Sequence, residues 1–145
     1  PLIINDRVDV ALAADADGVH VGQSDMPYEM VKRLLPEGKI IGLSVESPEQ
    51  VLEANNYDLD YVAASPVFST TTKTNTIVEW GLDGLRWIRS VSRHLLVAIG
   101  GIHSNNVASI CKAGADSVAV ISAIVSADDP ERAARELLEK SGEPH

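Results

Sequence analysis

The sequence predicts an α/β fold in which a parallel β-sheet alternates with helices. Short apolar runs rich in β-branched residues recur along the 145 residues, and segments with helical spacing separate them. Three similar stretches, ADADGVHV (14–21), YDLDYVAA (57–64) and AGADSVAV (113–120), each place an aspartate just before a strand. This recurrence indicates that one type of αβ loop is reused within a single domain, 1–145. The alternative is that helix ends and polar turns favour such residues anyway.

The expected strands follow one another at regular intervals from the start of the chain. Each is a short apolar run bounded by polar or turn-forming residues, which is typical of strands that are buried on both faces. In order, they are predicted at residues 2–4, 19–21, 40–43, 61–64, 95–99 and 118–121.

The helices between these strands have recognisable start and stop signals. The apolar stripe within residues 26–38 ends at Pro36 and Gly38. Ser47, followed by Pro48 and by a glutamine three residues on, predicts a capping box with proline at the first helical position. Gly114 closes the helix before the last strand, and an Asp-Pro pair at 129–130 begins the final helix.

Composition excludes several classes of protein. Twelve basic residues against twenty-one acidic ones give a net charge of −9, which does not suit a nucleic-acid binder. Cys111 is the single cysteine, so no intrachain disulfide framework is expected. No apolar run approaches the roughly 18 residues of a membrane span, and no signal-peptide pattern begins the chain. A cytoplasmic protein without membrane or nucleic-acid partners is therefore expected, and a homo-oligomer is left open.

In parallel α/β folds the chemistry lies at the carboxyl ends of the strands, so the residues after each strand are the informative ones. The glycines of AIGGI (98–102) would let backbone N–H groups approach an anion, and ISAI (121–124) predicts a short extra helix. Together these two loops favour a phosphate site. The residues after the strands are, in chain order, Asn5 and Asp6, residues 22–25, Ser44, a Thr-rich loop containing Lys73, Gly100 and Gly101, and Ser122.

Asp6 and Asp25 follow neighbouring strands, which lie about 4.8 Å apart in a parallel sheet. Two carboxylates with open coordination suit Mg²⁺, which keeps waters and binds phosphate oxygens. Spacing alone equally allows Asp6 to be the N-cap of the following helix and Asp25 to be a turn residue. The histidines form no metal cluster, and His20, within a strand, is expected to be a satisfied core residue. No nucleophile–base pair is evident, so covalent catalysis has no support.

Four motifs together resemble the thiamine-phosphate synthase family, in the same order and over essentially the whole chain. They are IINDRVDVALAADADGVHVGQSDMP (3–27), SPVFSTTTKT (65–74), VAIGGI (97–102) and GADSVAVISAI (114–124). The resemblance implies a (β/α)8 TIM barrel. It also implies a transferase that couples hydroxymethylpyrimidine pyrophosphate to a thiazole phosphate and releases pyrophosphate, by a dissociative, Mg²⁺-assisted substitution.

The resemblance also assigns roles to residues. Asp6 and Asp25 would hold the metal, and Ser44 and Lys73 would act on the pyrophosphate as catalytic residues. The substrate-binding residues would be Asn5, Thr70, Thr72, Gly100, Gly101, Ile121 and Ser122, most of them around the thiazole phosphate.

The chain departs from the family pattern in one respect. A Gln-x-Arg-x-Lys stretch that precedes the IIND strand in the family has no counterpart, and the six predicted βα units fall short of eight. The expectation is an incomplete, N-terminally truncated barrel without its first two βα units, whose own activity is uncertain. The alternatives are a relative resembling thiazole tautomerase, which would not need the aspartate pair, or a non-catalytic phosphate-binding barrel fragment.

Overall fold

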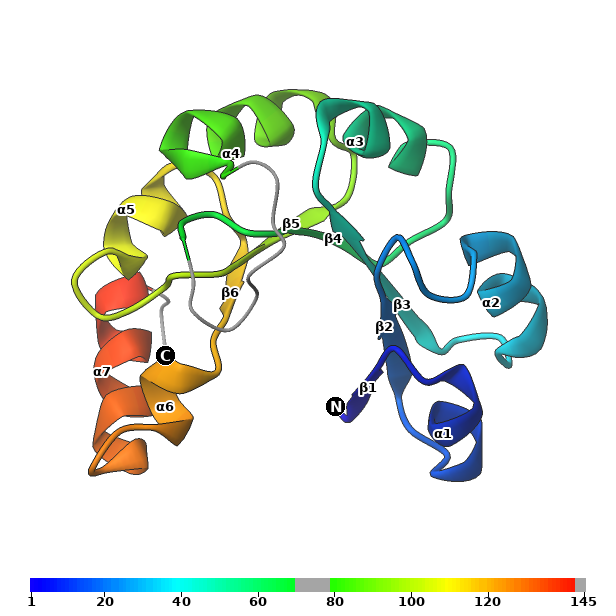
Figure 1. Ribbon diagram of the computed structural model, residues 1–145, viewed down its shortest axis with the longest axis horizontal. Coiled ribbons are helices and arrows are strands. Elements are labelled where there is room, and N and C mark those ends of the chain that lie inside the picture. The colour runs from blue at the N-terminus through cyan, green and yellow to red at the C-terminus, as the bar shows by residue number, and fades with distance from the viewer. Residues whose placement is uncertain (70–78, 143–145) are drawn as a thin grey trace.

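The computed structural model describes residues 1–69 and 79–142 and contains a parallel sheet whose strands follow the chain order β1-β2-β3-β4-β5-β6. The sheet curves into an arc, with β1 and β6 at its two ends (Figure 1). The predicted α/β class and the parallel sheet are therefore confirmed. The strands are β1 (Ile3–Asn5), β2 (Gly18–Val21), β3 (Ile40–Val45), β4 (Tyr61–Ala64), β5 (Leu95–Ile99) and β6 (Ser117–Ala119).

Four of the six strands differ from the predicted ranges by one or two residues at an end, and the first and last strands are the most instructive. The first strand extends to Asn5, which pairs with His20 of β2. The last strand ends at Ala119, before the predicted end at 121, because Ile121 turns away from the extended conformation and begins a short helix. An apolar run marks burial, but it does not mark where the ladder of hydrogen bonds stops.

The long helices cover the convex side of the arc (Figure 1). Ser47 caps its helix by accepting a hydrogen bond from the Gln50 amide at 3.4 Å, and the Gln50 side chain accepts one from the Glu46 amide at 2.7 Å. In the described part of the chain, no helix is long and apolar enough to cross a membrane. The helices are α1 (Val8–Ala13), α2 (Tyr28–Leu34), α3 (Pro48–Ala54), α4 (Gly81–Val91), α5 (Val107–Lys112), α6 (Ser122–Val125) and α7 (Pro130–Ser141).

The core lies between the convex face of the sheet and these helices. Successive side chains of a strand point to opposite faces, and one set of alternating strand residues is almost fully buried. In β2 this set is Val19 and Val21, which leaves His20 on the concave face. Alternation therefore fixes which strand residues face the inside of the arc.

The repeated aspartates support the sheet at its amino-terminal edge. Each one accepts a hydrogen bond from a backbone amide near the start of the neighbouring strand, either the residue just before it or its second residue, so one αβ loop type is indeed reused. This edge is opposite the one where chemistry is expected, so the repeat is a device for stability. The bonds run from the Leu2 amide to Asp17 (2.6 Å), from the Ile41 amide to Asp60 (2.8 Å) and from the Leu96 amide to Asp116 (2.7 Å).

Candidate functional site

A cavity of about 800 Å³ opens at the carboxyl ends of the strands, lined by residues that follow every strand of the sheet. It brings together all the candidate residues that lie in the described part of the chain. Thr70, Thr72 and Lys73 lie outside the described residues. The candidates that line the cavity are Asn5, Asp6, Asp25, Ser44, Gly100, Gly101, Ile121 and Ser122.

Asp6 has an unusual backbone conformation at the rim of this cavity. Its φ angle is +65°, in the left-handed region that few non-glycine residues adopt, and its amide donates to the His20 carbonyl at 2.8 Å. The N-cap position of α1 belongs to Arg7, not to Asp6. The N-cap alternative for Asp6 is therefore wrong, and this backbone conformation places an aspartate at the cavity without a capping role.

Asp25 closes a tight turn after β2. One of its carboxylate oxygens accepts a hydrogen bond from the Gly22 amide at 2.7 Å, and the Asp25 amide donates to the Gly22 carbonyl at 3.2 Å. The turn interpretation is therefore correct, but the same side chain also lines the cavity. A carboxylate has several acceptor sites, so one bond to an amide does not prevent it from binding a cation.

The donors around the cavity suit a hard cation that brings its own waters. Its carboxylates come from Asp6, Asp25 and Glu46. Among the described residues, no cluster of three or more His, Cys, Asp or Glu side chains is arranged to hold a metal ion. A fully protein-ligated ion therefore has no support there, whereas Mg²⁺ bound by one or two carboxylates and by substrate oxygens fits.

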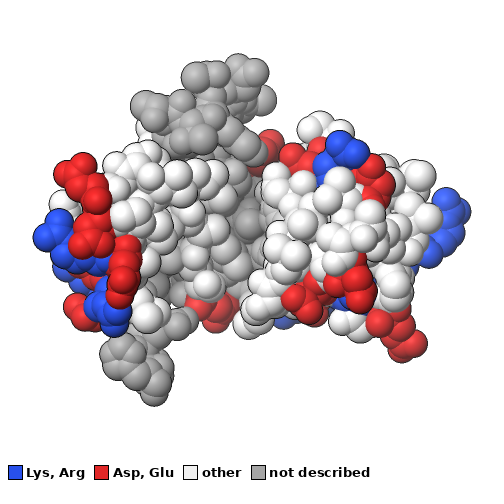
Figure 2. Space-filling view, turned by 90° about the horizontal axis from the view of Figure 1, so that it is seen from below, with Lys and Arg blue, Asp and Glu red and all other residues white. Residues whose placement is uncertain are grey.

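Positive charge is scarce around the cavity. Within residues 1–69 and 79–142, no lysine or arginine lines it. On the face shown in Figure 2, the lysine and arginine side chains lie in the left and right parts of the molecule, interspersed with acidic ones. The described lining residues therefore supply no lysine or arginine charge to an anionic ligand.

Ser44 is held in place from two directions. It is 7% exposed, and its carbonyl oxygen accepts a hydrogen bond from the Gln23 side chain at 2.7 Å. Its hydroxyl oxygen lies 2.8 Å from Nε2 of His20. The serine therefore reaches the cavity with its backbone and its side chain both restrained.

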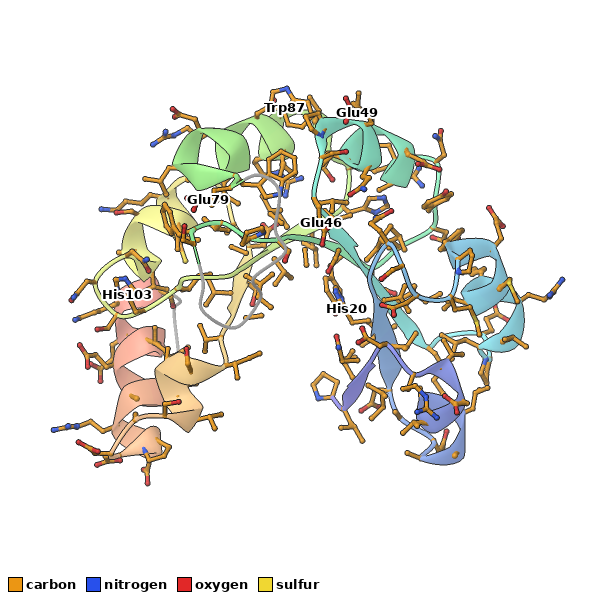
Figure 3. The ribbon with its side chains drawn as sticks, in the orientation of Figure 1. His20, Glu46, Glu49, Glu79, Trp87 and His103 are labelled. Atoms are coloured by element: carbon orange, nitrogen blue, oxygen red, sulfur yellow. The ribbon has the colours of Figure 1, made fainter. Side chains whose placement is uncertain are left out.

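His20 is a site residue that the sequence analysis did not identify. Instead of being a core residue, it projects from β2 into the concave side of the arc and lines the cavity (Figure 3). Its Nδ1 lies 3.0 Å from the Tyr61 hydroxyl, and the two rings stack with centroids 5.5 Å apart. The signal that could have revealed it is its position between Val19 and Val21, since those two face the helices.

Gly100 and Gly101 let two loops approach closely at the rim. Both have positive φ angles, +101° and +65°. A Cβ on Gly100 would lie 2.7 Å from Cβ of Pro66, and one on Gly101 would lie 2.8 Å from Cβ of Phe68. The glycines are therefore required by packing against the loop after β4, whether or not a phosphate binds beside them.

A curved parallel β/α sheet with a polar cavity at the carboxyl ends of its strands defines an α/β enzyme of the TIM-barrel kind. The family model described as thiamine monophosphate synthase matches residues 1–124. The chain belongs to this family.

Individual relatives agree with this family. The chain is 50% identical to the thiamine-phosphate synthase of Vibrio campbellii over 138 residues, covering 95% of this chain and 68% of the relative. It is 53% identical to that of Albidiferax ferrireducens, covering 94% of this chain and 63% of the relative. The solved thiamine phosphate pyrophosphorylase of Pyrococcus furiosus matches with a TM-score of 0.87 and 45% identity, over 96% of this chain and 66% of that one. The chain thus spans about two thirds of the length of these relatives.

Proposed function

We propose that the protein forms thiamine phosphate by joining hydroxymethylpyrimidine pyrophosphate to a thiazole phosphate, with release of pyrophosphate. The observation that carries this proposal is that one cavity collects every described candidate residue, at or just after the carboxyl ends of β1, β2, β3, β5 and β6. Membership of the thiamine monophosphate synthase family supports the same reaction.

The reaction makes specific demands on the site. The bond between the pyrimidine methylene and the pyrophosphate oxygen breaks first, the electron pair leaves with the pyrophosphate, and the thiazole nitrogen then attacks the resulting cation. The protein must neutralise the leaving group and hold the nucleophile in line. No side chain needs to act as a covalent nucleophile, in agreement with the sequence analysis.

The acidic half of the cavity would serve the pyrophosphate. Asp6 and Asp25 are the residues that would hold Mg²⁺, which supplies positive charge to the pyrophosphate oxygens when bound. Ser44, restrained by Gln23 and His20, would donate its hydroxyl hydrogen to the leaving group. Lys73 would add a positive charge, since no described lysine or arginine borders the cavity.

The glycine-rich half would hold the thiazole phosphate. The loop at Gly100 and Gly101 and the start of α6 at Ile121 and Ser122 border the same cavity and offer backbone N–H groups. These donors bind a phosphate without adding net charge beside the pyrimidine cation. Asn5, Thr70 and Thr72 complete the proposed substrate contacts.

We also propose that the six units form part of an eight-stranded (β/α)8 barrel. The sequential order of parallel strands and the curvature of the arc support this arrangement (Figure 1). The high structural similarity to the Pyrococcus furiosus protein supports it as well.

Titration calorimetry tests the function directly, with each substrate and with or without Mg²⁺. We expect the pyrimidine pyrophosphate to bind only with Mg²⁺ and the thiazole phosphate to bind without it. Asp15→Ala is a matched control, because Asp15 is exposed and does not line the cavity. Its carboxylate pairs with Nζ of Lys39 at a distance of 2.7 Å. Binding of the thiazole phosphate alone would instead identify a non-catalytic phosphate-binding protein, and binding of neither substrate would overturn the proposal.

A further inference from the structure

We propose that Tyr61 and His20 are positioning residues that aim the hydroxyl hydrogen of Ser44 into the cavity. The side chains come from three adjacent strands and form a continuous chain of contacts. The Tyr61 hydroxyl lies 3.0 Å from Nδ1 of His20, and Nε2 of His20 lies 2.8 Å from the Ser44 hydroxyl oxygen. The effect on turnover rests on the proposed function, whereas the orientation of the chain of hydrogen bonds does not.

Gly42 makes this contact chain possible. The register pairs His20 with Gly42 and Gly42 with Tyr61, so the glycine lies on β3 directly between the other two. A Cβ at this position would lie 2.1 Å from Cζ of Tyr61 and 2.4 Å from its hydroxyl oxygen. The ring of Tyr61 therefore crosses β3 through the space that a side chain would occupy, and reaches His20 two strands away.

The available donors and acceptors set the direction of the chain. A neutral imidazole has one N–H donor and one acceptor nitrogen. If Tyr61 donates to Nδ1, then Nε2 carries the hydrogen and donates to Ser44. In the reverse direction Nδ1 would donate to the Tyr61 oxygen, and the Tyr61 hydroxyl hydrogen would need another acceptor. Among the described residues, no other group forms a hydrogen bond with this hydroxyl. Burial also raises the pKa of Tyr61, which keeps its hydroxyl protonated as a donor.

This direction has a chemical consequence at Ser44. Because the serine oxygen accepts the Nε2 hydrogen, its own hydrogen is left to point into the cavity that the residue lines. An anionic leaving group would meet a hydroxyl donor, and such charge-assisted bonds are about twice as strong as neutral ones. The reverse direction would present an oxygen lone pair to the anion instead.

The tautomer of His20 tests the inference without any substrate. Long-range ¹H–¹⁵N correlation spectra of protein labelled in its histidine rings distinguish a protonated nitrogen from a bare one. We expect a bare Nδ1 and a protonated Nε2 for His20, assigned by the loss of its signals in His20→Gln. His94 is an internal control for folding, since its ring contacts the Leu59 and Ala54 carbonyls at 3.1 and 2.9 Å, outside the chain of contacts.

Variants separate the role of the Tyr61 hydroxyl from that of the Tyr61 ring. Tyr61→Phe keeps the ring but removes the donor, so His20 should become a mixture of tautomers while the His94 signals stay unchanged. Tyr57→Phe is the matched control, because the Tyr57 hydroxyl donates to Glu53 at 2.8 Å and neither residue lines the cavity. This variant should leave the His20 signals unchanged. A protonated Nδ1 in the unmodified protein, or an unchanged His20 in Tyr61→Phe, would overturn the inference.

Turnover gives a second readout. We expect Tyr61→Phe to lower kcat by about tenfold to a hundredfold, as is common for groups that orient a ligand, with little change in KM. In a Ser44→Ala background the same change should have no further effect, because the hydroxyl that it orients is gone. Additive losses would show that Tyr61 acts elsewhere. Absence of turnover in the unmodified protein would count against the proposed function, while the tautomer would still decide the present inference.

Discussion

Replacing Gly42 with alanine is expected to destabilise the protein by displacing Tyr61. The three heavy atoms nearest to the added Cβ would be Cζ, the hydroxyl oxygen and Cε1 of Tyr61, at 2.1, 2.4 and 2.6 Å. Carbon atoms in contact normally lie about 3.5–4.0 Å apart, so the end of the ring must move by more than an ångström. Because β3 is paired on both sides, the side chain moves more easily than the backbone.

The size of the effect follows from the contacts that the ring would lose. The hydrogen bond to His20 contributes about 0.5–1.5 kcal/mol, and the stacked pair contributes a similar amount beyond its burial. Exchanging glycine for alanine recovers about 0.4–1 kcal/mol by restricting the unfolded chain. The expected net loss is about 1–2 kcal/mol, measured by urea denaturation at constant m-value.

A double-mutant cycle makes this prediction specific. In a Tyr61→Ala background, Gly42→Ala should be neutral or slightly stabilising, because the colliding ring is absent and only the effect on the unfolded chain remains. Gly18→Ala is the control, since its Cβ would lie 2.3 Å from the backbone oxygen of Ile40, and its cost should be the same in both backgrounds. If Gly42→Ala costs as much without Tyr61 as with it, the crossing of β3 by the ring is refuted.

Four further predictions address the site and the sheet. Asp6→Ala and Asp25→Ala should each abolish Mg²⁺-dependent turnover but leave thiazole phosphate binding nearly intact by calorimetry; normal rates at limiting Mg²⁺ would contradict this. Lys73→Ala should slow pyrophosphate release by about 10²-fold or more, with a smaller change in thiazole phosphate affinity, because the charge is needed in the transition state. Asp116→Ala should cost about 1–2 kcal/mol in urea denaturation, because the half-exposed carboxylate accepts a hydrogen bond from the amide of the second residue of β5 at 2.7 Å. Burial raises the pKa of Tyr61, so its contribution to stability should be complete below about pH 10 and lost as pH rises through the higher folded pKa; Tyr61→Phe should flatten this alkaline decline.

The sequence predicts the strands well because burial on both faces leaves continuous apolar runs. All six strands lie where these runs occur, β4 and β5 with the predicted bounds, whereas the ends of the other four differ by one or two residues. Those ends depend on pairing with a neighbouring strand, as when Asn5 pairs with His20. The local pattern of apolar residues does not determine this pairing. Capping signals were more reliable, since Ser47 acts on an amide only three residues away.

The candidate site could be predicted as far as topology determines it. A parallel sheet brings the ends of its strands to one edge, so residues after different strands share a cavity without any information about side-chain packing. The role of each side chain within the site is harder to predict from the sequence. Asp25 both closes a turn and lines the cavity, and spacing cannot reveal that one side chain does both.

The contact between His20 and Tyr61 shows why the rest could not be predicted. The two residues are 41 positions apart, and a strand lies between them. Alternation indicates only that both face the concave side of the sheet. Their contact depends on the register that places Gly42 between them, and a one-residue shift of β3 would replace this glycine with Ile41 or Leu43.

The same register explains why a polar pair is tolerated in the inner layer of the sheet. Inner layers of β/α barrels are usually filled by branched apolar side chains, and burying an unpaired polar group costs free energy. At the level of His20, the space above β3 is filled by the Tyr61 ring, whose hydroxyl is paired with the imidazole. The other imidazole nitrogen contacts Ser44, the next inward-facing residue of β3 beyond Gly42. Tyr61, His20 and Ser44 hold one another in place through these contacts, so the packing that fills the layer also restrains the hydroxyl that lines the cavity.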